Sequence, residues 1–340
     1  MTDLIINKVP SLTWHFLKMN DARVRWQEPL GAADTDAAGA DELYTDNSGS
    51  QGYFPADDTD VLFSADTARV SVTAGENETI TARVCFDDCG ESRSAQLCVN
   101  AAKGSSVTVF VTLKGCSYLA FRSKTVVSEN ADVKLVLTEL TESGGRLITD
   151  SDAYVGEKGK LSMLRFCPGT AGTYAQSRVL LKGDESSLFS RTSYLGCESQ
   201  KLDMNYVIAH IGKRTSCDIA ANGALDDNAS KTFRGTIDFR CGSSGSFGNE
   251  TENVLLLGDN IENKTLPIIL CDEEDVCGNH GATIGKISEE SLLYFASRGI
   301  SPEQAERLLT LAISDAFCRM VGDDELTQLI KARTEGDDHD

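Results

Sequence analysis

Short stretches in which apolar and polar residues alternate run along most of the chain between Val61 and Cys271. They are rich in Val, Thr, Leu and Phe, and clusters of Gly, Asn, Asp and Ser separate them, which is the pattern of β-strands joined by turns. Proline is nearly absent here, as expected for long ladders of paired strands. The pattern predicts strands over 79–86, 107–113, 118–127, 133–140, 178–181, 188–195, 204–211, 232–240 and 254–257.

Two architectures fit such a run of strands, a pair of β-sandwiches or a β-solenoid. Predicted strands begin near 79, 106 and 132, and again near 178, 204 and 230, so they recur at steps of about 26 residues, close to one coil of a solenoid. The repeat is visible in polarity and not in residue identity. The spacing favours the solenoid, and the sandwich stays open at this point.

The chain changes character after Cys271. Residues 288–297 are predicted to form a short helix that ends at Gly299, and Ser301-Pro302-Glu303-Gln304 has the residues of a helix N-terminus with a capping box. A long amphipathic helix follows to Met320, and a third covers 324–332. The predicted organisation is an N-terminal segment with an acidic linker (1–60), a β core (61–287), a helical region (288–334) and an acidic tail (335–340).

The N-terminal segment has two parts. Residues 1–30 carry both tryptophans and a short apolar cluster, which indicates a docking segment or a first strand. Residues 31–60 contain eight acids and no base among small residues, a composition typical of an exposed linker.

Charge and composition restrict the function. The 340 residues carry 32 basic and 52 acidic side chains and a net charge of −20, which argues against nucleic acid as a partner. No apolar run approaches the ~20 residues that a membrane-spanning helix needs, and the first residues lack a secretory signal, so we expect no membrane association and a cytoplasmic protein. The 11 cysteines are scattered and odd in number, which favours reduced thiols over a disulfide framework.

Few residues have the spacing of a chemical site. No nucleophile elbow, phosphate-binding loop, dinucleotide fingerprint or zinc-protease motif occurs, so we do not expect an enzyme. Cys277 and His280 form a C-x2-H pair among four acids and flanking glycines, a spacing able to hold a soft or borderline metal ion through two ligands. The alternative is a tight Gly-Asn turn whose histidine bonds backbone. His210 lies within a predicted strand, where a core role is the simpler interpretation.

One family resemblance draws these features together. Asn279-His280-Gly281-Ala282-Thr283-Ile284-Gly285 leads into Leu292-Leu293-Tyr294-Phe295 and Ser297-Arg298-Gly299-Ile300, and this order of motifs resembles the SufB/SufD family. The stretches 254–257 and 266–270 also resemble it, and weaker similarities lie at 14, 17–20, 210 and 233–237. The resemblance is strong over about 204–320.

The resemblance implies a right-handed parallel β-helix and a scaffold role in SUF iron–sulfur cluster assembly. It implies pairing with a SufB-like β-helix chain, binding of a SufC-like ABC ATPase by the C-terminal helices, and a transient iron–sulfur cluster shared with the partner chain. His280 and Cys277 become cluster-ligand candidates, and His210 a candidate interface histidine. The ATPase-binding region would include Leu292, Phe295, Arg298, Gly299, Leu309 and Phe317. Pairing of the chain with itself stays open, and no residue pattern supports a flavin, which the resemblance leaves as a further cofactor candidate.

Two features point to the SufD side of the family. The scaffold cysteine that SufB-type proteins carry in the last β coil is absent from 254–263, and Gly281 follows the histidine where SufB-type proteins tend to have glutamate. Many SufD proteins have a cysteine two residues before the histidine, but Gly278 stands there, which leaves His280 as the leading candidate. Two rival functions share parts of the pattern, a β-solenoid carbohydrate-active or adhesin-type protein and a stand-alone metal-binding module.

Overall fold

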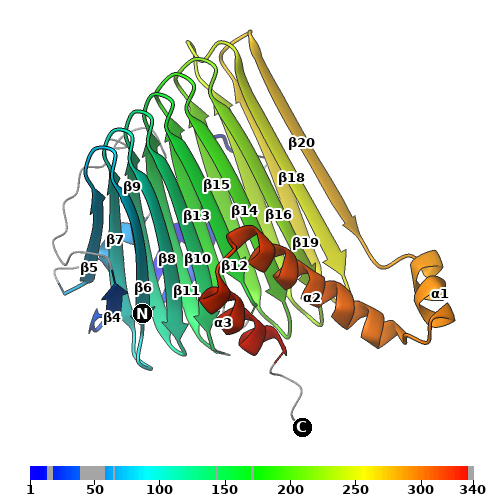
Figure 1. Cartoon of the computed structure of the whole chain (residues 1–340). Helices are drawn as coiled ribbons and strands as arrows, with labels where there is room; N and C mark the ends of the chain where they lie inside the picture. The colour runs from blue at the N-terminus through cyan, green and yellow to red at the C-terminus, as the bar shows by residue number, and fades with distance from the viewer. Residues whose placement is uncertain (14–17, 39–57, 64–65, 143, 170–171, 336–340) are drawn as a thin grey trace.

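Successive strands of this chain pair with strands one coil away, and their sequence neighbours lie in the opposite sheet. In the computed structural model, which describes residues 1–13, 18–38, 58–63, 66–142, 144–169 and 172–335, two nine-stranded sheets face each other and form a β-solenoid (Figure 1). Nearly all pairs are parallel. The fold confirms the predicted parallel β-solenoid, and the sandwich alternative is wrong.

The two sheets alternate along the chain. The first contains β4 (Asp34–Ala38), β6 (Thr79–Asp87), β8 (Ser106–Gly115), β10 (Asp132–Thr141), β12 (Lys160–Cys167), β14 (Ser187–Gly196), β16 (Ser216–Leu225), β18 (Ser246–Leu256) and β20 (Val276–Gly285). The second contains β3 (Gly31–Ala32), β5 (Ala68–Ala74), β7 (Arg93–Ala101), β9 (Tyr118–Val127), β11 (Arg146–Val155), β13 (Gly172–Leu181), β15 (Lys201–His210), β17 (Ser230–Phe239) and β19 (Glu262–Cys271).

Apolar side chains at every second position along the strands point inward and fill the space between the two sheets. In-register pairing stacks Val107 on Val133, Leu161 and Leu188, so one apolar ladder runs through four coils. These side chains are at most 3% exposed. Burial of such ladders on every inward position is the main stabilising contribution, because each apolar side chain removed from water contributes about 1.5–3 kcal/mol.

The predicted strands are confirmed, and the structure adds others between them. Strand β9 has the predicted bounds, and the remaining predicted strands lie within longer observed ones, except that 204–211, 232–240 and 254–257 each run one residue past the observed end. Within the β core, strands β5, β7, β11, β12, β16, β19 and β20 were not predicted. Residues 276–285, for which a tight turn was the alternative interpretation, form β20, so that interpretation is wrong.

The N-terminal segment covers the outer face of the second sheet. Strands β1 (Thr2–Ile6) and β2 (Ala22–Trp26) form an antiparallel hairpin whose apolar side chains pack on Ala120, Ile148 and Tyr174. Trp26 is fully buried and meets the ring of Tyr118 edge-on, with centroids 5.1 Å apart. The apolar cluster at 12–17, for which a docking segment or a first strand was predicted, lies between these two strands, and its residues 14–17, with Trp14 and His15, lie outside the described residues.

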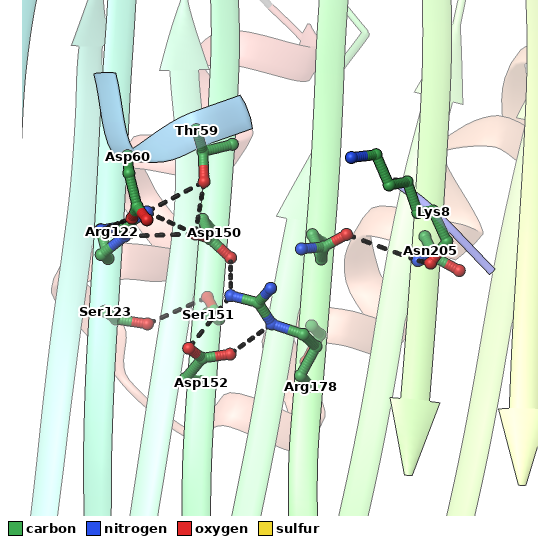
Figure 2. Close-up of polar contacts among 12 residues, drawn as sticks. Lys8, Thr59, Asp60, Arg122, Ser123, Asp150, Ser151, Asp152, Arg178 and Asn205 are labelled. Carbon is green, nitrogen blue, oxygen red and sulfur yellow. Dashed lines mark hydrogen bonds and ion pairs between the residues drawn. The ribbon is translucent and has the colours of Figure 1, made fainter. Parts of the chain in front are cut away.

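A buried ion cluster fixes the short 3-10 helix Asp58–Leu62 on the same face (Figure 2). Asp150, 1% exposed, accepts hydrogen bonds from Arg122, Arg178 and the hydroxyl of Thr59. The two guanidinium groups hold the pKa of the Asp150 carboxyl below its usual value, against the effect of burial. The two positive guanidinium groups balance the negative charge of the Asp150 carboxylate, so this carboxylate can lie buried under the 3-10 helix.

The acidic linker prediction is partly wrong. Strands β3 and β4 pair with β7 and β6, and the 3-10 helix packs against the solenoid, so the described parts of 31–60 are structured. The pattern of small and acidic residues gave no strand signal because β4 is a fully exposed edge strand. Residues 39–57, and the predicted tail at 336–340, lie outside the described residues.

Three helices follow the last coil: α1 (Glu289–Ser297), α2 (Pro302–Val321) and α3 (Asp324–Glu335). Helix α2 crosses β12, β14 and β16, and the α2–α3 corner packs on the outer face of the first sheet (Figure 1). Phe317 is fully buried against Phe166, with ring centroids 5.3 Å apart. Gly322 ends α2 with φ +68°, a left-handed conformation that glycine adopts without strain.

The predicted capping box at the start of α2 is present and gives a testable expectation. The Ser301 hydroxyl accepts from the Gln304 backbone N–H, and the Gln304 side chain accepts from the Ser301 N–H. We expect Ser301→Ala to lower the free energy of unfolding of the helical region by about 1 kcal/mol, because the Gln304 N–H loses its acceptor. Hydrogen exchange of the first turn of α2 measures this loss. Ser297→Ala, at the end of α1, is the control and should leave α2 unchanged.

Candidate functional site at the open end of the solenoid

The last coil of the solenoid has no cap among the described residues. Strands β19 and β20 stand at the ends of their sheets and pair on one side only. Every residue of β19 is at least partly exposed, and most residues of β20 are exposed, whereas the preceding strand β17 is almost entirely buried. Apolar side chains therefore reach solvent here, among them Ile284 at 45% exposure. An apolar edge of this kind is a template for another chain.

Strand geometry places His280 and Cys277 on opposite faces of β20. Position 278 faces inward, because a Cβ on Gly278 would lie 3.0 Å from the ring of Phe239. Side chains alternate along a strand, so His280 shares the inward face and Cys277 points outward. The structure does not bring the C-x2-H pair together as two ligands of one ion. Cys277 is exposed and lies beside the paired Phe247, itself 42% exposed.

Two glutamates lie directly beneath this face. Register pairs His280 with Glu250 of β18, and Glu252 follows two residues later on the same inward face. Glu250 and Glu252 are 2% and 1% exposed. A Cβ on Gly235 of β17 would lie 2.2 Å from a carboxylate oxygen of Glu250, so the glycine makes room for this carboxylate between the sheets.

The environments of the two glutamates differ. Glu252 forms an ion pair with Lys231 and accepts hydrogen bonds from Tyr194 and Thr265. Glu250 Oε2 has no hydrogen-bond partner among the described residues. Burial, with a smaller effect of the Glu252 charge, raises the pKa of Glu250 to about 8. A carboxyl group of this kind at the end of a core is a candidate functional group.

His210 is part of the core, which corrects its prediction as an interface histidine. Its side chain is fully buried. Nδ1 lies 2.7 Å from the Thr215 hydroxyl, Nε2 lies 3.3 Å from Cys217 Sγ, and the ring stacks on Phe239. Burial lowers the pKa of His210 to about 3 and raises the pKa of the Cys217 thiol to about 12, so both are neutral. A side chain with no exposed surface does not meet a partner chain.

The predicted ATPase-binding residues differ in how exposed their side chains are. Phe317 is fully buried against the β sheet, so its prediction as a partner contact is wrong. Leu292, Phe295 and Leu309 are half-buried, and Arg298 and Gly299 are exposed at the end of α1. Gly299 has φ +77° at the position after the helix, as its sequence context indicated. The largest exposed apolar side chains on these helices were missed, namely Leu293 (73%), Tyr294 (55%) and Leu308 (49%).

Comparison with protein families identifies the chain. The model of the SUF system FeS cluster assembly SufBD core domain matches residues 85–313, two-thirds of the sequence. The chain belongs to the SufBD core domain family. The match begins well before the stretch 204–320 in which the sequence motifs are strong. The family resemblance is confirmed.

Relatives of both types within the SufBD family are similar to the chain. It is 28% identical to the iron–sulfur cluster assembly protein SufD of Bacillus subtilis, over 55% of this chain and 43% of that protein. It is 25% identical to SufB of the same organism, over 49% and 37%, and 23% identical to SufD of Escherichia coli, over 69% and 56%. The chain thus spans about half the length of the relatives it matches, and the identities do not separate SufD from SufB.

Within the described residues, no three His, Cys, Asp or Glu side chains converge on a point that could hold a metal ion. The described helices include none with the length and hydropathy needed to cross a bilayer. Glu250 and Glu252 were not predicted as site residues, because the predicted strand began only at Val254. The available signal was that both glutamates stand at the same alternating positions as Val254, on the inward face of the strand.

Proposed function

We propose that this SufBD protein is a SufD-like scaffold that pairs with a SufB-like chain and a SufC-like ABC ATPase to assemble and transfer iron–sulfur clusters. The observation that carries the proposal is the open end of the solenoid, where an inward-facing histidine lies on an edge strand that pairs on one side only. Imidazole is a suitable ligand for an iron–sulfur cluster that a partner chain shares. In this role the cluster is cargo.

The edge formed by β19 and β20 supports pairing with a second solenoid. Both strands present unpaired backbone groups on one side, and Leu266, Ile268 and Leu270 lie half-exposed on the outer face of β19. A partner strand added to either edge would satisfy these backbone groups and bury this apolar surface. His280 would then lie at the junction of the two chains.

The C-terminal helices supply a separate surface for the ATPase. Helix α1 has no buried residue and stands apart from the sheets (Figure 1). Leu293, Tyr294 and Leu308 expose apolar area on α1 and α2 while Phe317 and Ile330 anchor the helices to the β body. An anchored helix pair with an exposed apolar rim is suited to docking another protein.

The SufD assignment rests on two absences within the sequence. No cysteine occurs in 254–263, and Gly281 follows His280 in place of a glutamate. A chain lacking its own scaffold cysteine would depend on a partner for thiolate ligands, which favours a heterodimer over pairing with a second copy.

Affinity purification of the tagged protein from its own cells, under anaerobic conditions, tests the proposal. We expect recovery of an ABC-type ATPase and a second SufBD chain, both identified by mass. Leu293→Asp should reduce recovery of the ATPase at least tenfold and keep the SufBD partner, because it places a charge on the helical surface only. Leu12→Asp, an equally exposed leucine near the N-terminus, is the matched control.

Other outcomes have defined meanings. Recovery of a second copy and no SufBD partner would replace the heterodimer by a homodimer. Purification of a monomer with neither partner would contradict the proposed assembly role and favour a stand-alone metal-binding module.

A further inference from the structure

Glu250 is the one inward-facing carboxylate at the open end whose charge and hydrogen bonds the described residues leave uncompensated. It is 2% exposed, and its Oε2 atom has no hydrogen-bond partner among them. Its neighbour Glu252 shows the alternative, since a lysine, a tyrosine and a threonine surround that carboxylate. Burying a polar atom without a partner costs about 1–3 kcal/mol, so such an atom needs an explanation.

The space around Glu250 is shaped for a carboxylate. The facing residue on β17 is Gly235, and a Cβ there would lie 2.2–2.4 Å from the carboxyl atoms of Glu250. Any other residue at 235 would therefore displace the glutamate side chain. Packing alone does not account for the pair, because an apolar side chain at 250 would fill the same space without the cost of a buried polar group.

His280 lies next to the Glu250 carboxylate, on the neighbouring strand β20. The two residues are register partners on β18 and β20, and both side chains lie on the inward face. Neighbouring strands are about 4.8 Å apart. Metal–nitrogen and metal–oxygen bonds are about 2.0–2.2 Å long, so one ion between the rungs is within reach of both side chains.

We propose that Glu250 and His280 together bind one divalent transition-metal ion at the open end of the solenoid. The ligands are one carboxylate oxygen and one imidazole nitrogen, a set that suits iron(II) and its neighbours in the first transition row. His280 is exposed, so the ion enters from solvent and keeps positions for water or for ligands of a partner chain. Iron(II) as the physiological ion rests on the proposed function; the cation site itself does not.

Cobalt(II) binding to the isolated full-length chain tests the site, because visible absorption reports both occupancy and ligand type. We expect one cobalt ion per chain with absorption typical of oxygen and nitrogen ligands. Glu250→Gln and His280→Ala should each weaken binding at least tenfold. Glu262→Gln, on the exposed side of β19, is the matched control and should bind as the wild type does.

Glutamine has nearly the shape of the protonated glutamate, so Glu250→Gln keeps the packing against Gly235. An unchanged urea midpoint at pH 7 for this variant excludes loss of the fold as the cause of weaker binding. Cys277→Ser separates the proposed site from a thiolate site. Loss of cobalt binding in Cys277→Ser, unchanged binding in Glu250→Gln, or no stoichiometric binding by the wild type would each overturn the proposal.

The cation site and the assembly role fail separately. If cobalt does not bind but the ATPase and the SufBD partner are recovered, the site is wrong and the scaffold role stands. If cobalt binds through Glu250 and His280 but neither partner is recovered, the site stands and the scaffold role is wrong.

Discussion

Replacing Lys231 by methionine is expected to lower the free energy of unfolding by about 3–5 kcal/mol, because it leaves the Glu252 carboxylate buried without its counter-charge. Lys231 and Glu252 are each 1% exposed and form an ion pair inside the solenoid. Burial lowers the pKa of Lys231, and the adjacent carboxylate partly opposes that effect. Urea denaturation of the variant and the wild type at pH 7 measures the difference.

The double variant Lys231→Met with Glu252→Gln separates the missing charge from lost packing. Glutamine keeps oxygen and nitrogen atoms near Tyr194 and Thr265 without a charge, so most of the lost stability should return. Lys103→Met, which removes a lysine from the exposed ion pair with Glu129, is the control and should leave the urea midpoint unchanged. A double variant as unstable as Lys231→Met alone would show that packing, and not charge, is the cause.

This ion pair illustrates what the alternation of apolar and polar residues along a strand could and could not predict. Lys231 precedes the predicted strand 232–240 by one residue and stands at the same alternating positions as Phe233, Ile237 and Phe239, so extending the pattern by one residue places its side chain inside. Its partner is 21 residues away in the opposite sheet, and nothing local in the sequence links them. Periodicity predicts which face a residue takes, and pairing across the core needs the register of both sheets.

Strand boundaries likewise separate what the local pattern predicts from what depends on tertiary contacts. Tyr118–Val127 was predicted with its observed bounds because alternating Leu, Phe and Val residues define it and glycine or asparagine clusters flank it. Residues 276–285 were not predicted as a strand, because glycine, asparagine and histidine dominate them. Gly278 is required there by a close approach of Phe239 from the other sheet, a tertiary constraint that resembles a turn signal in the sequence.

The candidate site was found in part, through the family resemblance. That resemblance selected His280, and the structure places its side chain on the inward face of the edge strand β20. The C-x2-H pairing with Cys277 followed from spacing alone, and spacing is ambiguous until the secondary structure is known: three residues apart places two side chains on opposite faces of a strand but on one side of a helix. Glu250 required the register of β18 against β20.

The pH dependence of stability is the second large effect that we expect, and it comes from His210. Its pKa is lowered to about 3 by burial, from an ordinary value of 6.5. The side chains in contact with the ring are Thr215, Cys217 and Phe239, none of which is charged, since burial also keeps the Cys217 thiol protonated. The unfolded chain therefore binds a proton at this histidine over a pH range in which the folded chain does not.

The direction of the effect follows from that difference. The stabilising contribution of neutral His210 is complete above pH 6.5 and is lost progressively as the pH falls toward 3, at about 1.4 kcal/mol per pH unit. Between pH 7 and pH 5 the wild type should lose about 2 kcal/mol more than His210→Gln, in which this group does not titrate. Urea denaturation at both pH values measures the two losses, and subtraction removes the titration of the other groups.

A second variant tests whether burial or hydrogen bonding is responsible. Thr215→Val removes the hydroxyl 2.7 Å from Nδ1 and keeps the histidine buried. Because burial is the cause of the lowered pKa, this variant should be less stable at every pH and show the same loss between pH 7 and pH 5 as the wild type. If His210→Gln and the wild type lost equal stability over this range, His210 would be protonated as readily in the folded chain as in the unfolded one, and its position as a neutral core residue between the two sheets would be wrong.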